Sequence, residues 1–176
     1  MDGTAMKDFL VKSFKNGRQV CITGRPGCGK TYIVIEAARD AGYDLIVSHP
    51  AISDPTDFRG FPTKDADGQH ATFLPFGEMW QAIKAVKPAV FFLDDLGQAS
   101  ESTMKALMQL VWGRRLNGFT LPEHIVICAA TNRIGDKAGV TGIIEPVKSR
   151  FHTIVELETS MDSWCGWALK RQPAIP

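Results

Sequence analysis

A glycine-rich segment near the start of the chain holds the residues whose types and spacing are most specific. It is Gly24, Arg25, Pro26, Gly27, Cys28, Gly29, Lys30 and Thr31, directly followed by Tyr32. The β-branched run 20–23 before it predicts a buried strand, and residues 32–38 after it predict a helix. Glycines allow a tight turn that an anion can approach closely, and backbone N–H groups at a helix N-terminus bind phosphate. The pattern therefore predicts a nucleotide-binding loop in which Lys30 contacts the β- and γ-phosphates and Thr31 is a Mg²⁺ ligand.

Two consecutive carboxylates form the second candidate element. Residues 89–94 are almost wholly apolar and end at Asp94, with Asp95 next in the chain. Such a run predicts a strand that is buried on both faces of a parallel sheet. Ligands of open α/β sheets bind at the carboxyl ends of strands, where Gly24 and Asp94 both fall. We expect Asp94 to hold Mg²⁺ and Asp95 to orient or polarise the attacking water.

Two more polar residues follow later strands. Asn132 comes after the apolar run 125–130, and its amide could bond both the γ-phosphate and the lytic water. Arg150 closes a short predicted helix before the last strand, where it could serve this chemistry only by facing a neighbouring subunit. Taken alone, Thr-Asn after a strand is typical of a turn, and a single arginine is typical of a protein surface.

The elements that must position these residues alternate along the chain. We predict five strands, at residues 19–23, 43–48, 89–94, 125–130 and 152–157. Helices are predicted at residues 30–41, 78–87 and 100–112, after a short amphipathic segment at 9–18. The segment 49–77 is rich in Pro, Gly and Asp, and Asp67-Gly68 within it predicts a hairpin turn or an exposed loop. The alternation predicts a three-layer α/β domain whose mainly parallel sheet has helices on both faces.

Composition excludes several classes of protein. The chain has 176 residues, 44% of them hydrophobic, and a net charge of +1. The high hydrophobic fraction and the low net charge disfavour disorder. The chain also lacks the surplus of basic residues that drives binding to a nucleic-acid backbone. No apolar run could span a bilayer, and we find no signal peptide, so we expect a cytoplasmic protein. The four cysteines form no close pair, so we expect free thiols. The four histidines do not have the spacing of metal ligands.

In this order, the motifs resemble those of the AAA+ ATPase family. Residues 24–31 are similar to its Walker A motif and residues 91–95 to Walker B, with Asn132 as sensor 1 and Arg150 as the trans-acting arginine finger. The resemblance covers residues 7–170 and is greatest for the MoxR-like branch. The segments that carry this branch resemblance are 57–62, 96–99 and 146–151.

The resemblance implies a P-loop NTPase fold with ATP and Mg²⁺ as its ligands. It implies the strand order 5-1-4-3-2, in the numbering of the five strands given above, and a hairpin insert at about residues 61–75 near the second helix. Residues 1–158 would form the AAA+ core, and 159–176 would be either the start of a helical lid that is largely absent or a C-terminal tail. A MoxR-like protein would act in a homo-oligomeric ring, with hexamers expected, and would remodel a partner that often contains a von Willebrand A domain.

The chain departs from the family pattern at Asp95, where the family usually has glutamate, so the carboxylate lies about one methylene further back. The chain could therefore be an assembly module that binds nucleotide with weak or no hydrolysis. A nucleic-acid motor, a clamp-loader-like ATPase and a small-molecule kinase are less favoured alternatives. For the segment 61–76, contact with a threaded substrate and packing on its own domain both stay open.

Overall fold

The computed structural model describes residues 1–133, 135 and 142–170. Its middle layer is a parallel sheet with the order β2-β5-β8-β1-β9. The bounds are β1 Val20–Gly24, β2 Asp44–Ser48, β5 Ala89–Leu93, β8 Ile125–Asn132 and β9 Thr153–Leu157. Counted along the chain, this is the predicted order 5-1-4-3-2, and the predicted fold class is confirmed.

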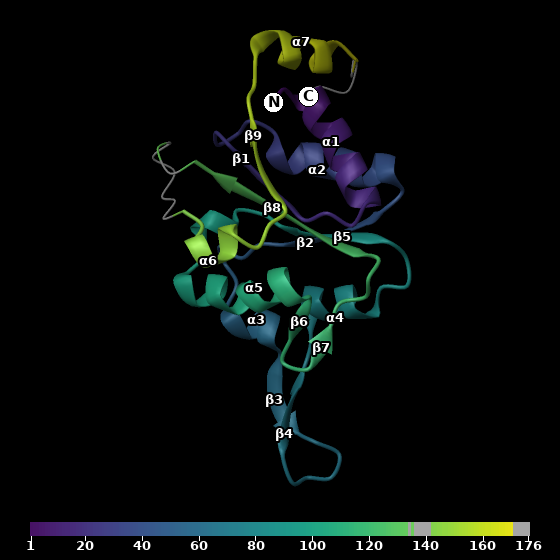
Figure 1. The fold of residues 1–176 in the computed structure, drawn as a ribbon, viewed down its shortest axis with the longest axis vertical. Coiled ribbons are helices and arrows are strands. Elements are labelled where there is room, and N and C mark those ends of the chain that lie inside the picture. Colours follow the sequence, from purple (N-terminus) through teal and green to yellow (C-terminus); the bar gives the residue numbers. More distant parts are fainter. Residues whose placement is uncertain (134, 136–141, 171–176) are drawn as a thin grey trace.

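Helices cover both faces of the sheet (Figure 1). One layer consists of α1 Gly3–Lys15 and α2 Lys30–Ala41; the other consists of α3 Pro55–Arg59, α4 Gly77–Lys84, α5 Glu101–Gly113 and α6 Glu145–Lys148. Because strand side chains alternate between faces, β5 serves both layers. Its Phe91 and Leu93 pack with α3 to α6, while Val90 and Phe92 pack with α1 and α2. The helix α7 Met161–Lys170 follows β9.

Two helices differ from their predicted bounds by more than one residue at one end or both. The first, α1, begins at Gly3 rather than at residue 9, because Asp2 caps it by accepting a hydrogen bond from the Ala5 backbone N–H at 2.9 Å. Its buried side chains Met6, Leu10 and Phe14 recur every four residues and form one apolar face. The fourth, α4, ends at Lys84 rather than at 87, and its C-cap residue Ala85 is extended, with ψ 126°.

The segment 49–77 contains a helix that was not predicted and a hairpin that was. Asp54 and Asp57 form a capping box around Pro55, and this starts α3. The hairpin pairs β3 Phe61–Lys64 with β4 Ala71–Leu74 and projects from the domain (Figure 1). All residues of β3 and β4 are exposed, which disfavours packing of the two strands on their own domain.

A second, shorter hairpin lies beside the first. It joins β6 Arg115–Leu116 to β7 Phe119–Thr120 through a turn at Asn117 and Gly118, both of which have positive φ. A 3-10 turn, η1 Leu96–Gln98, follows β5. None of the helices built from described residues has both the length and the apolar character that a membrane span needs.

Candidate active site

The glycine-rich loop connects β1 to α2 at the carboxyl edge of the sheet. A Cβ atom at Gly24 would lie 3.0 Å from Cys28 Sγ and 3.1 Å from the Leu157 carbonyl oxygen, so a larger residue there would crowd both neighbours. Gly29 has φ +88°, a conformation that glycine adopts without strain, and α2 starts directly after it. Arg25, Pro26, Gly27 and Gly29 are exposed, and Tyr32 is half-buried in the first turn of α2. The backbone of the loop is therefore accessible to a ligand.

The Lys30 side chain forms hydrogen bonds both within this loop and with Asn132 at the end of β8. Its Nζ donates hydrogen bonds to the carbonyl oxygens of Gly24 at 3.1 Å and Arg25 at 2.9 Å, and to Asn132 Oδ1 at 2.7 Å. The side chain is only 7% exposed. The three acceptors match the three protons of the ammonium, which is how a buried charge is accommodated. The structure therefore fixes one positive charge between the loop and the end of β8.

Asn132 is the residue that joins the cation to the carboxylates. It lies beside Gly24 in the parallel register of β8 and β1. While its Oδ1 accepts from Lys30, its Nδ2 donates to Asp95 Oδ1 at 3.4 Å. These two contacts orient the amide, with its oxygen toward the ammonium and its nitrogen toward the carboxylate.

Asp94 and Thr31 place two oxygen atoms side by side. Thr31 Oγ1 donates to Asp94 Oδ2 at 2.8 Å, and the backbone N–H of Asp95 donates to Asp94 Oδ1 at 3.1 Å. Hydroxyl and carboxylate oxygens are the ligands that Mg²⁺ prefers. Two carboxylates against one lysine leave an excess negative charge, which a divalent cation would offset. The donor set and the charge both fit Mg²⁺.

Asp95 has an unusual backbone conformation, with φ +53° at the corner after β5. Aspartate and asparagine are the non-glycine residues that best tolerate this left-handed region. Strained conformations of this kind concentrate at functional sites. The side chain at this corner contacts Asn132, so the strained position is also a contact position of the site.

Arg150 lies apart from the other candidate residues. It follows α6, and its Nη1 donates to the Pro146 carbonyl oxygen and, at 3.4 Å, to Ser149 Oγ. Its Nε is buried without a hydrogen-bond partner among the residues that the structure describes. The structure thus brings together Lys30, Thr31, Asp94, Asp95 and Asn132, but its described hydrogen bonds do not bring Arg150 to them.

The four cysteines are free thiols and differ in reactivity. Burial raises the pKa of Cys21 to about 12 and raises that of Cys128 as well. Because only the thiolate is nucleophilic, a raised pKa lowers the reactive fraction at neutral pH. We expect N-ethylmaleimide to modify exposed Cys165 rapidly and to leave Cys21 and Cys128 intact until the protein is unfolded, as peptide mass spectrometry would show.

In the same labelling experiment, Cys28 reports nucleotide binding, and Cys165 is the control. Cys28 is half-buried in the glycine-rich loop, with Sγ 4.0 Å from Lys30 Nζ. ATP bound at the loop should slow its modification without changing the rate at Cys165. Labelling of Cys21 or Cys128 at the rate of Cys165 would contradict the burial that the structure shows.

Residues 20–159 match the model of the AAA family, the ATPase family associated with various cellular activities. The chain belongs to this family. Membership supports ATP-dependent activity for this AAA chain, and members of the family typically bind ATP with Mg²⁺ and form rings. No curated protein matches the chain significantly.

Solved structures share the fold of this AAA chain at low sequence identity. A putative ATPase from Cytophaga hutchinsonii is 14% identical with a TM-score of 0.64, over 97% of this chain and 51% of that one. The RuvB Holliday junction branch migration motor of Thermotoga maritima is 17% identical with a TM-score of 0.58, over 89% of this chain and 44% of that one. The chain thus spans about half the length of these structures.

Proposed function

We propose that this AAA chain binds ATP with Mg²⁺ and hydrolyses the terminal phosphate at the site around Lys30. The observation that carries the proposal is the double contact of Asn132, which accepts from Lys30 and donates to Asp95. One side chain thereby links the phosphate-binding cation to the carboxylate proposed to act on water. An ordinary glycine turn before a helix would have no need of this link.

Each residue has a role that its position supports. The loop N–H groups of residues 24–31 and the Lys30 ammonium bind the β- and γ-phosphates. Thr31 and Asp94, whose side-chain oxygens lie together, would hold Mg²⁺, and the ion would offset the negative charge of the phosphates. Asp95 and Asn132 position the attacking water, and Asp95 acts as the general base that accepts a proton from this water.

Arg150 from a neighbouring copy would complete the site. In phosphoryl transfer an arginine finger stabilises the charge that develops in the transition state. One observation supports its action in trans: its described hydrogen bonds stay within residues 146–149, so none of them joins it to the site of its own chain.

We further propose a MoxR-like role for the chain in the cytoplasm, in which a homo-oligomeric ring, with six copies expected, remodels a partner protein. Segments 57–62, 96–99 and 146–151 support this branch, and a von Willebrand A domain protein is a candidate partner. Residues 1–158 would be the core, and α7 would belong to the lid that begins at 159. Nucleic acid fits the net charge of +1 poorly.

A nucleotide-driven assembly module is the second candidate function, and Asp95 favours it. The side chain of Asp95 is one methylene shorter than that of the family's usual glutamate. The hydrogen bond from Asn132 Nδ2 to Asp95 Oδ1 is long, at 3.4 Å. In this case ATP would drive association of the chains, while hydrolysis would be weak or absent.

Phosphate release measured over a wide range of protein concentrations tests the proposal. We expect release that stops when EDTA removes Mg²⁺, with a rate per chain that rises with concentration until assembly is complete. Light scattering of the same samples reports assembly. Assembly with ATP but without phosphate release would favour the second candidate, and a rate per chain independent of concentration would exclude the role of Arg150 in trans.

A further inference from the structure

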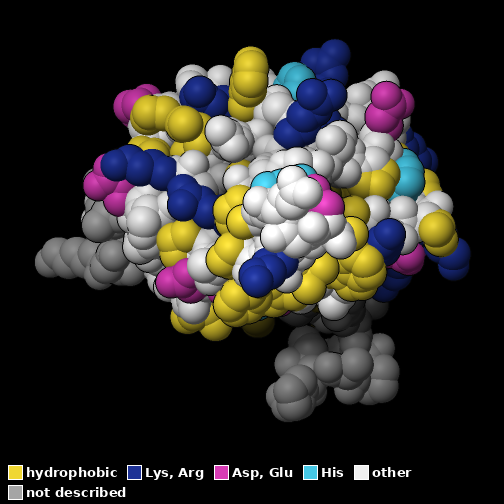
Figure 2. All heavy atoms as spheres, turned by 90° about the horizontal axis from the view of Figure 1, so that it is seen from below, with side chains coloured by type: hydrophobic (Ala, Val, Ile, Leu, Met, Phe, Trp, Pro, Cys, Tyr) yellow, Lys and Arg dark blue, Asp and Glu magenta, His cyan; other side chains and the backbone are white. Residues whose placement is uncertain are grey.

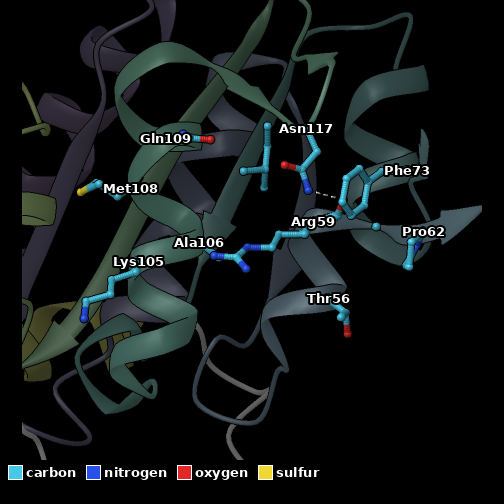
Figure 3. Close-up of a pocket in the computed structure, with 11 residues that line it drawn as sticks. Thr56, Arg59, Pro62, Phe73, Lys105, Ala106, Met108, Gln109 and Asn117 are labelled. Carbon is cyan, nitrogen blue, oxygen red and sulfur yellow. Dashed lines mark hydrogen bonds between the residues drawn. The ribbon is translucent and has the colours of Figure 1, made fainter. Parts of the chain in front are cut away.

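A pocket outside the ATPase site lies at the base of the two hairpins. It has a volume of about 430 Å³, within the range of ligand-binding pockets, and its walls come from α3, α5, β3, β4 and the β6–β7 hairpin (Figure 3). None of the residues of the proposed ATPase site lines it. The pocket therefore needs an explanation of its own.

The charge of the pocket is positive. Among the described residues, Arg59 and Lys105 are the ionisable ones that line it, and none of the described carboxylates does. Lys105 Nζ already pairs with Glu101 Oε1 at 2.8 Å, whereas the Arg59 guanidinium has no partner among the described residues. Figure 3 shows the Arg59 side chain extending from α3 toward α5. One free guanidinium therefore faces the pocket, ready for an anion.

The backbone that carries Arg59 is held on two sides. The preceding residue, Phe58, is 1% exposed and anchors α3 in the core. On the other side, Asn117 Nδ2 donates to the Arg59 carbonyl oxygen at 3.0 Å, the contact dashed in Figure 3. These contacts fix the backbone from which the Arg59 side chain extends toward the pocket.

The other walls of the pocket are largely apolar. Its apolar lining residues include Pro62 and Phe73 of the first hairpin, Met108 of α5 and Leu116 of β6. Next to the pocket, Phe61 and Leu74 are each 57% exposed, which extends the apolar surface along the hairpin. On the face seen from the hairpin side, hydrophobic side chains lie among lysines and arginines (Figure 2). A ligand that fits must combine an anion with an apolar group.

We propose that this pocket binds an acidic segment of a partner protein. An Asp or Glu carboxylate of the segment pairs with Arg59 through the two-pronged geometry that guanidinium favours, and an adjacent apolar side chain packs on Phe73. Nucleic acid fits less well, because its binding depends on several uncompensated cations and the pocket offers one. The inference goes beyond the proposed ATPase, since this binding needs no nucleotide.

Panning a displayed library of random octapeptides on the chain without nucleotide tests the inference. The enriched peptides are then synthesised with a fluorophore, next to twins in which Asn and Gln replace Asp and Glu. Fluorescence anisotropy gives their affinities for the wild type, Arg59→Gln and Phe73→Ala. The matched control is Arg39→Gln, an exposed arginine on α2 across the sheet. Thermal melts confirm that each variant is folded.

We expect enriched peptides that place Asp or Glu beside an apolar residue. Arg59→Gln, Phe73→Ala and the amide twins should each weaken binding about tenfold or more, as loss of a charge-assisted pair or an aromatic contact predicts. Arg39→Gln and Lys30→Ala should leave it unchanged, and the latter separates this site from the ATPase. Peptides without acidic residues, equal affinity for Arg59→Gln, or no enrichment would overturn the inference. Arg59-dependent binding of an oligothymidine probe, with no peptide enriched, would replace it with a nucleic-acid site.

Discussion

Lys30→Ala is expected to abolish measurable nucleotide binding. The ammonium is the one positive charge that the structure fixes within the loop, and its loss would leave the phosphates facing Asp94 and Asp95. Lys30 is proposed to contact both the β- and the γ-phosphate, and each hydrogen bond to a charged group contributes about 1.5–3 kcal/mol, so loss of both should lower affinity about a hundredfold or more. Titration calorimetry with ATP and Mg²⁺ measures the effect directly.

The matched control for this variant is Lys12→Ala, which removes an exposed lysine from α1. Its affinity for ATP should equal that of the wild type. Because Lys30 is buried, a thermal melt must accompany the titration to show that the variant is folded. A folded Lys30→Ala protein with unchanged affinity would refute the assignment of the loop.

Asp95→Asn is expected to stop hydrolysis while nucleotide binding persists. Asparagine has the same shape, tolerates the φ of +53° equally well, and can still accept a hydrogen bond from Asn132. The substitution therefore removes the charge and leaves the local structure intact. Loss of a general base lowers kcat by about 10² to 10⁴. Phosphate release under saturating ATP reports kcat, and calorimetry reports the affinity.

Asp44→Asn is the control for this second variant. Asp44 is exposed at the amino end of β2, the edge of the sheet opposite the site, so both parameters should stay at wild-type values. Wild-type kcat in Asp95→Asn would show that Asp95 does not act on water. A joint loss of kcat and affinity would indicate instead that Asp95 supports the site structurally.

The features that could be predicted from the sequence are those that depend on residues close together in the chain. Spacing alone identified the loop, because each of its glycines and Lys30 act within one turn. The same kind of signal exists for α3, where Asp54 and Asp57 form a capping box, although the surrounding Pro and Gly residues had favoured a loop. The start of α1 was missed for a similar reason, since Asp2 is a cap that precedes a weakly apolar turn.

Contacts between distant segments required the structure. Lys30 and Asn132 lie 102 residues apart, and only the register of β1 against β8 makes them neighbours. The spacing of motifs indicated that both lie at the same sheet edge but not that they touch. The presence of an aspartate at position 95 did not by itself predict a left-handed backbone conformation there. The pocket around Arg59 depends on the packing of segments from residue 56 to residue 117, so no single pattern predicts it.

Mixing two inactive variants tests the central claim most directly, namely that one chain's loop and another chain's Arg150 form a shared site. Lys30→Ala lacks the loop cation but keeps Arg150, and Arg150→Ala has the converse defect. Each alone should release little phosphate, although Arg150→Ala should still bind ATP. Their mixture should release more than the sum of the two, because some interfaces combine an intact loop with an intact Arg150. A mixture no more active than that sum, or an Arg150→Ala variant as active as the wild type, would contradict the account.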